Sequence, residues 1–122
     1  MNTITRETWN RGDTIAILID EITDVNGDLV TSFASWEFHA SLKAANDDAD
    51  ASAIATLDTA AFTQDAANSK VIGYLETESL SLDLETDYYF DAQTVDANGY
   101  VTTAIERILV FKRDTTQRIT DL

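Results

Sequence analysis

The chain contains no cysteine and no proline, and only four glycines, one methionine and one histidine among its 122 residues. The lack of cysteine excludes a disulfide scaffold and any cysteine-based zinc or redox site. The single histidine, His39, excludes multi-histidine metal sites and leaves one candidate for a catalytic triad. The longest apolar run has five residues, from Ile15 to Ile19, so we expect neither a membrane span nor a signal peptide.

Positive charge is also scarce. Eight Lys and Arg stand against 22 Asp and Glu, which gives a net charge of -14 at pH 7. Such a chain is repelled by nucleic acid and by anionic membranes, so neither is an expected partner. The 44% of hydrophobic residues is enough to build a core and argues against disorder. The length predicts one domain, residues 1–122, and the composition favours a protein that is not an enzyme.

Apolar and polar residues alternate along much of the chain, which is the period of a β-strand rather than of a helix. The clearest strands are predicted at 14–20, 36–42, 88–95 and 100–111, with shorter ones at 3–9, 53–57 and 70–75. Within 36–42, the residues expected to face the core are Trp36, Phe38, Ala40 and Leu42. Without a disulfide, Trp36 and the other aromatic residues are expected to fill the core centre. Helical signal is weak, with single turns expected at most at 60–67 and 76–84.

Two Asp-x-Asn-Gly sequences, at 24–27 and 96–99, lie between apolar runs. Glycine favours the positive φ that a tight hairpin turn requires, so both are predicted to be turns, the second more strongly. About seven short strands without a regular βαβ alternation predict an all-β fold, an antiparallel β-sandwich. The Asp-rich and Ala-rich segment 44–55 is expected to be a solvated loop between two strands.

Three motifs suggest chemistry, and each has a simpler structural interpretation. The adhesion tripeptide Arg11-Gly12-Asp13 is interpreted as a turn, in which Gly12 bends the chain and Asp13 bonds nearby backbone N–H groups. His39 is expected to be exposed on the polar face of a strand. The carboxylates of Asp47, Asp48 and Asp50 lack the glycine and distal glutamate of a calcium loop. We therefore expect no metal, no cofactor and no catalytic residue.

Charge is distributed unevenly along the chain. Residues 12–106 hold 19 acids and two bases, Lys43 and Lys70, a net of -17. The two ends hold six bases and three acids, a net of +3. The first and last strands of a sandwich commonly lie side by side, so these bases are predicted to form a basic strip that docks on an acidic protein surface. Alternatively, they balance local acids and solubilise edge strands. The predicted protein-binding residues are Arg6, Arg11, Arg107, Lys112, Arg113 and Arg118.

The order of motifs resembles a known family. Arg11-Gly12-Asp13-Thr14 opens an Ile-rich strand, and Tyr88-x-Phe90-Asp91-Ala92-Gln93 precedes the turn Asp96-Ala97-Asn98-Gly99. With the Trp36-x-Phe38-x-Ala40-x-Leu42 strand, this resembles the small immunoglobulin-like virion proteins of tailed bacteriophages, which include the N-terminal domain of upper baseplate proteins and short head and tail accessory proteins. Two turns depart from the family pattern: Glu85-Thr86-Asp87 replaces a stretch that usually contains glycine, and residues 104–107 lack a common glycine.

The resemblance implies an immunoglobulin-like sandwich and a structural, multi-copy role without catalytic residues. It implies a decoration, collar or connector protein of the head or neck that binds capsid, neck or tail proteins and copies of itself, in a virion assembled in the bacterial host cytoplasm. Two alternatives remain: a tail or baseplate adaptor for fibres, and a free carbohydrate- or receptor-binding module that uses Trp9, Tyr74 or Tyr100. The polar ends, about 1–11 and 112–122, are expected to be arms that are ordered by neighbours.

Overall fold

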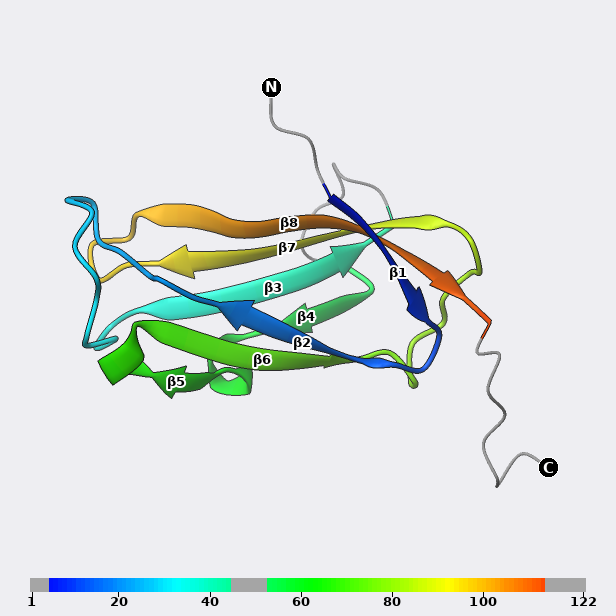
Figure 1. Ribbon diagram of the computed structural model, residues 1–122, viewed down its shortest axis with the longest axis horizontal. Helices are drawn as coiled ribbons and strands as arrows, with labels where there is room; N and C mark the ends of the chain where they lie inside the picture. Colours follow the sequence, from blue (N-terminus) through cyan, green and yellow to red (C-terminus); the bar gives the residue numbers. More distant parts are fainter. Residues whose placement is uncertain (1–4, 45–52, 114–122) are drawn as a thin grey trace.

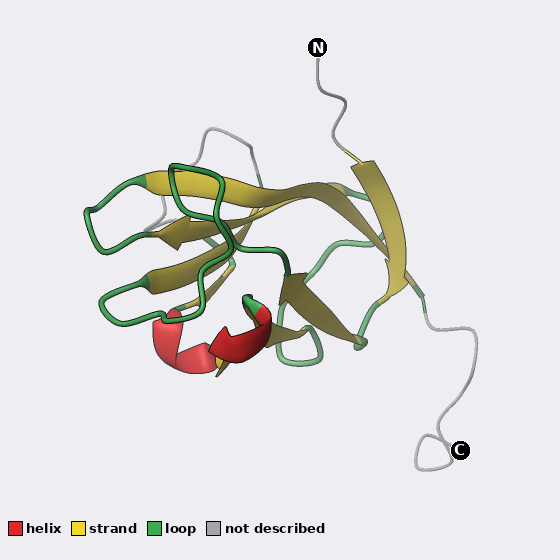
Figure 2. Cartoon of the chain, turned by 60° about the vertical axis from the view of Figure 1, so that its left-hand side comes forward, coloured by secondary structure: helices red, strands yellow, loops and turns green. Residues whose placement is uncertain are grey.

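The computed structural model describes residues 5–44 and 53–113, which form two β-sheets packed face to face (Figure 1). The larger sheet has the strand order β1-β8-β7-β3-β4, and the smaller has the order β2-β6-β5. The strands are β1 Thr5–Asn10, β2 Thr14–Ile19, β3 Glu37–Lys43, β4 Ala55–Leu57, β5 Thr63–Asp65, β6 Lys70–Glu76, β7 Asp87–Val95 and β8 Val101–Lys112. Two short 3-10 turns, η2 Thr59–Ala61 and η3 Ala66–Asn68, flank β5 (Figure 2).

The predicted all-β sandwich is confirmed, with one difference in pairing. All neighbouring strands pair antiparallel except β1 and β8, which pair parallel from Thr5↔Arg107 to Asn10↔Lys112. Most of the expected N-terminal arm is therefore an edge strand, because its backbone pairs with β8 and its Trp9 packs against the core. Residues 1–4 and 114–122 of the expected arms lie outside the described residues.

The core lies between the sheets and follows the two-residue alternation. Ile15, Ile17 and Ile19 of β2 are buried, as are alternate residues of β3, β7 and the second half of β8. The centre is filled by the fully buried side chains of Phe38, Leu42, Val71, Leu109 and Phe111. The expectation that Trp36 fills the centre is wrong, because Trp36 is only partly buried and packs against the edge of the core.

Two expectations of helical turns also need correction. Instead of one helical turn at 60–67, the chain forms η2, β5 and η3. Buried Phe62 holds this segment against the core, and Thr63 pairs with Ile72 of β6. Residues 77–86 contain no helix and cross from β6 to β7. No helix within the described part of the chain is long and apolar enough to cross a membrane.

The Arg11-Gly12-Asp13 sequence forms the predicted turn between β1 and β2. Gly12 has a φ of 102°, and the Asn10 N–H donates to Asp13 Oδ2 at 2.9 Å. Thr77, which is fully buried, fastens this turn to the end of β6: its hydroxyl accepts from the Gly12 N–H at 3.0 Å and donates to the Asp13 carbonyl at 2.7 Å. The tripeptide thus has a structural role at the entrance to β2.

Candidate docking surface

Large apolar side chains are exposed at one end of the sandwich, where the β2–β3 connection meets the β7–β8 turn. Val25 is 70% exposed and Leu29 60%. On the other connection, Tyr100 is 61% exposed, and Val101 at the start of β8 is 59% exposed. Among the described residues, two further large apolar side chains are exposed, Leu18 and Tyr74, and both belong to strands of the smaller sheet. We call residues 20–36 and 96–101 the loop end; it lies on the left in Figure 1.

The loop end is built from two turns with the same hydrogen bonds. In one, Asp24 Oδ1 accepts from the N–H groups of Asn26 and Asp28, at 2.9 and 3.1 Å. In the other, Asp96 Oδ1 accepts from Asn98 and Tyr100, both at 2.9 Å. In each turn a glycine, Gly27 or Gly99, adopts a positive φ of 85° or 88°. This is a type I turn closed by a left-handed glycine, so both predicted Asn-Gly turns are confirmed.

The longer connection, residues 20–36, is fixed by its own backbone and core contacts. The Ile22 N–H donates to the Ser69 carbonyl and the Val30 N–H to the Ile22 carbonyl, both at 2.9 Å. Ile22 and Phe33 are buried in the core. The Phe33 ring lies 5.9 Å from the Trp36 ring and 5.2 Å from the Phe38 ring, in edge-to-face contacts. The connection therefore presents its exposed side chains from a supported backbone.

Between the two turns runs an open groove of about 440 Å³. Val25, Leu29 and Val30 line one side of the groove, Asp96, Ala97 and Asn98 line the other, and Trp36 also contributes to it. The loop end carries five acids, Asp20, Glu21, Asp24, Asp28 and Asp96, and no Lys or Arg. An apolar centre within an acidic rim is the composition of a protein interface whose partner has a basic rim.

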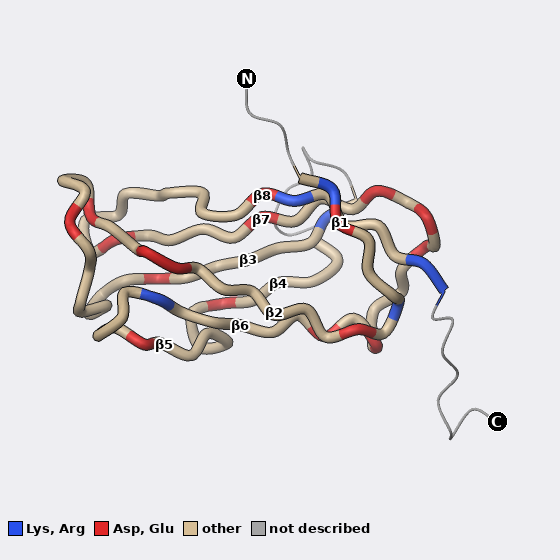
Figure 3. The backbone as a smooth tube through the Cα atoms, in the orientation of Figure 1, with Lys and Arg blue, Asp and Glu red and all other residues tan. Residues whose placement is uncertain are grey.

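Five of the six predicted binding bases lie in or next to β1 and β8. The parallel register aligns Thr5 with Arg107 and Asn10 with Lys112, which brings the bases to one edge of the larger sheet but not to one face. Arg107 lies on the face of Glu7, whereas Arg6 and Lys112 lie on the opposite face. Arg11 and Arg113 directly follow the two strands. Arg118 lies outside the described residues. The strip is not purely basic (Figure 3), because the β6–β7 segment adds acids to it. Arg11 shares a surface hollow with Glu78 and Asp83.

Two of these bases form ion pairs within the chain. The Arg6 guanidinium lies 3.0 Å from Asp87 Oδ2, and Arg107 Nε lies 3.2 Å from Glu7 Oε2. Both pairs are partly exposed, so each adds little to stability. This geometry favours the alternative that these bases balance local acids. A docking role for the six residues stays a prediction.

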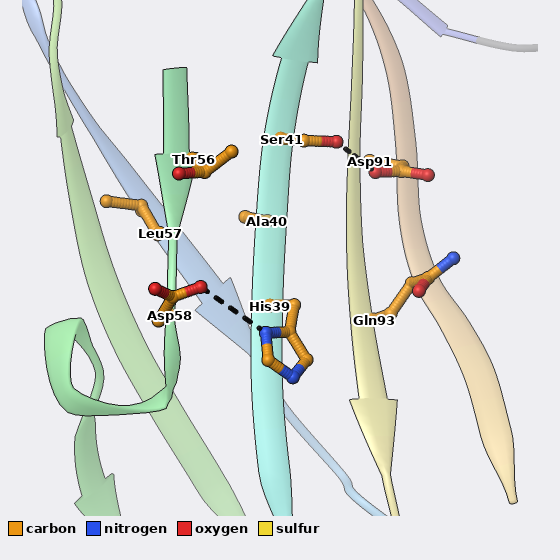
Figure 4. A pocket seen from close by; sticks show the side chains of 8 residues that line it. All are labelled: His39, Ala40, Ser41, Thr56, Leu57, Asp58, Asp91 and Gln93. Carbon is orange, nitrogen blue, oxygen red and sulfur yellow. Dashed lines mark hydrogen bonds and ion pairs between the residues drawn. The ribbon is translucent and has the colours of Figure 1, made fainter. Parts of the chain in front are cut away.

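His39 lies in a polar hollow on the outer face of the larger sheet, between β4 and β7 (Figure 4). Its Nε2 is 3.0 Å from Glu37 Oε1 and its Nδ1 is 3.6 Å from Asp58 Oδ1. The ring points toward Asp58, whereas the Ser41 hydroxyl donates to Asp91 Oδ1 at 3.0 Å. A nucleophile–base pair needs a hydrogen bond between hydroxyl and imidazole, and these contacts instead hold Ser41 and His39 in separate pairs.

The other candidate residues are dispersed. Trp9 is partly buried against the core, Tyr74 lies on the outer face of the smaller sheet and Tyr100 lies at the loop end, so these rings form no common stacking platform. The carboxylates of Asp47, Asp48 and Asp50 lie outside the described residues. Residues 5–44 and 53–113 contain no group of three or more potential His, Asp or Glu metal ligands.

Sequence reasoning missed the loop end as a surface. The sequence predicts a turn at 24–28 and a strand from Tyr100 onward, and neither pattern by itself indicates an exposed apolar surface. One signal was present: Val25 and Leu29 are large apolar residues within an acidic turn, where alternation gives them no buried face. No protein-family model matches the chain, and a search of curated proteins found no match. The likeness to phage proteins therefore rests on the motifs given above.

Proposed function

We propose that this chain is a non-enzymatic structural protein of a tailed-phage virion, a multi-copy accessory component of the head or neck that binds capsid, neck or tail proteins. The observation that carries a binding role is the exposure, by 59–70%, of four large apolar side chains at one end of the sandwich, two of which line an open groove. They are Val25 and Leu29, which line the groove, and Tyr100 and Val101. Large apolar side chains exposed beside an open groove are typical of an interaction site. The motif resemblance supplies the virion context.

The loop end suits binding because its parts are already ordered. Loops held at the end of a rigid sandwich provide binding surface without disturbing the core. The hydrogen-bonded turns and the Phe33–Trp36 contact reduce the conformational entropy that binding would otherwise remove. In this proposal Leu29 and Val25 enter an apolar recess of the partner, while Lys or Arg residues of the partner face the acidic rim.

The test uses particles of a phage that encodes this chain. Cryo-electron microscopy and quantitative mass spectrometry of purified virions measure its position and copy number. A variant with Val25→Ser and Leu29→Ser is compared with Tyr74→Ser, which removes an apolar side chain of similar exposure from the smaller sheet. Burial of one such side chain contributes about 1.5–3 kcal/mol, so we expect the double variant to lower affinity for particles by roughly a hundredfold or more.

Tyr74→Ser should occupy particles like the wild type. Full occupancy of particles by the double variant would show that the loop end is not the binding surface. Absence of the wild-type protein from virions would refute the virion role. Location at the baseplate, in contact with fibres, would instead support the alternative of a fibre adaptor.

A further inference from the structure

The edge strands of the two sheets differ in how they are protected. The edges are β1 and β4 in the larger sheet, and β2 and β5 in the smaller one. Strands β4 and β5 have three residues each, and β1 carries Arg6 and Glu7. Strand β2 has six residues, Thr-Ile-Ala-Ile-Leu-Ile, with no charge, proline or glycine. Charged residues, proline and short length usually protect an edge strand against further pairing. Strand β2 has no charged residue and no proline, and it is not short.

The direction of the free backbone groups of β2 follows from one hydrogen bond. The Thr77 N–H donates to the Asp13 carbonyl at 3.3 Å, so Asp13 faces β6. Because facing residues alternate along an antiparallel ladder, Ile15, Ile17 and Ile19 also bond to β6. The N–H and C=O groups of the alternate residues therefore point to the open edge; these residues are Thr14, Ala16 and Leu18.

A groove of about 300 Å³ runs beside this edge. Residues 15–18 of β2 line one wall, and the facing wall includes Trp9 of β1 and Ile105 and Leu109 of β8. Pairing of β1 with β8 covers only residues 107–112, so within the described part of the chain residues 101–106 of β8 have no strand on that side. The groove thus combines free backbone groups with an apolar wall.

The charges around this groove favour a cationic occupant. Asp20 and Glu21 follow directly after β2 and are exposed. On the wall, Glu7 is offset by Arg107 at 3.2 Å. The rim is therefore net negative, and a bound segment with Lys or Arg near its end would meet Asp20 and Glu21.

We propose that the open edge of β2 binds an extended segment of a partner polypeptide, which adds to the smaller sheet as a fourth strand. Main-chain hydrogen bonds to Ala16 and Leu18 hold the segment, and alternate apolar side chains enter the groove against Trp9, Ile105 and Leu109. A Lys or Arg of the segment lies beside Asp20 and Glu21. Apart from Asp20 and Glu21, which also border the loop end, this surface is distinct from it, so the inference does not depend on the proposed virion role.

The probe is a synthetic peptide, acetyl-KVTVTVK-amide, which alternates valine with threonine and ends in lysine. Two analogues carry N-methyl groups on either all valine or all threonine nitrogens. Binding is followed by amide NMR of the labelled full chain. We expect the amides of Ala16 and Leu18 to shift and to exchange at least tenfold more slowly with the parent peptide. One methylated analogue should bind at least tenfold more weakly, because only one set of its N–H groups faces β2.

Two proline variants test the same edge from the protein side. Ala16→Pro removes an N–H that points to the open edge, and should keep the fold while weakening peptide binding at least tenfold. Ile17→Pro removes an N–H bonded to β6 and should lower the urea midpoint instead. The double variant Val25→Ser and Leu29→Ser should bind the peptide like the wild type, which separates this site from the loop end.

Three results would overturn the inference. The first is equal binding of the parent peptide and both methylated analogues, a comparison that leaves the protein unchanged. The second is peptide-induced shifts confined to residues 22–36 and 96–101. The third is slow exchange of the Ala16 amide in the free protein together with a dimer in sedimentation, since a second copy would then cover β2.

Discussion

The hydroxyl of Thr77 both accepts and donates a hydrogen bond, and its replacement tests how the β1–β2 turn is held. Its hydroxyl accepts from the Gly12 N–H at 3.0 Å and donates to the Asp13 carbonyl at 2.7 Å, while the residue is 0% exposed. Thr77→Val preserves the shape but removes both bonds. The Gly12 N–H then loses its acceptor, at a cost of about 1–3 kcal/mol for a buried donor.

Other terms refine this value. Gly12 is only partly buried, so water offsets part of the loss, and the Asp13 carbonyl keeps its bond from the Thr77 N–H at 3.3 Å. The lost bond from the hydroxyl to Asp13 contributes about 1 kcal/mol, and the added methyl group recovers somewhat less than that. We expect Thr77→Val to lower the free energy of unfolding by about 2 kcal/mol.

The assay is urea unfolding followed by tryptophan fluorescence, with Thr77→Ser as the matched control. Serine keeps the hydroxyl and removes one methyl group, which costs about 1 kcal/mol in a buried site. With a slope near 2 kcal/mol/M, the valine variant should shift the midpoint by about 1 M and the serine variant by about half as much. Faster exchange of the Gly12 amide in the valine variant alone would locate the effect. A valine variant as stable as the serine variant would refute the reasoning.

Two further predictions concern packing and the turns. Gly73→Ala places a Cβ 2.9 Å from Cδ1 and Cε1 of the buried Phe62 ring, so we expect the free energy of unfolding in urea to fall by about 1–3 kcal/mol. Adding Phe62→Leu should remove most of the effect of Gly73→Ala, because the smaller side chain relieves the contact. Additive effects of the two substitutions would contradict this. Asp96→Ala removes the acceptor of the Asn98 and Tyr100 N–H groups and should cost about 1 kcal/mol. Asp24→Ala should lower the free energy of unfolding by the same amount within about 0.5 kcal/mol, because Asp24 accepts the same two backbone hydrogen bonds as Asp96. A larger difference in urea unfolding would show that the two turns are stabilised differently.

Much of the fold can be predicted from the sequence because the core follows strict alternation. Ile15, Ile17 and Ile19 repeat every second residue, and the same period places Phe38, Ala40 and Leu42 inward. The turns at Gly27 and Gly99 are predictable because their backbone conformation depends on local residues. These elements need no knowledge of distant partners.

The elements that sequence reasoning missed depend on contacts between distant segments. Strand β5 has the polar sequence Thr-Gln-Asp and forms only because its backbone pairs with β6. The parallel pairing of β1 with β8 joins the two ends of the described chain, and alternation does not report strand direction. The bases at the chain ends were predicted as one strip, but Asp87 and Glu78 come to that side from a segment remote in sequence.

The absence of a disulfide shapes how this sandwich supports its surfaces. Phe38 is fully buried and its ring lies 5.2 Å from Phe33 and 6.2 Å from Phe62, so one aromatic cluster joins β3, the β2–β3 connection and the segment before β5. Trp36 extends this cluster to the loop end, since its ring lies 6.4 Å from Phe38 and it also lines the groove there. The packed aromatic rings therefore continue from the core to the candidate docking surface. A substitution that removes ring contacts of Phe38 should therefore change the structure of the loop end more than that of the β2 edge. The β2 edge is held in register by its ladder with β6.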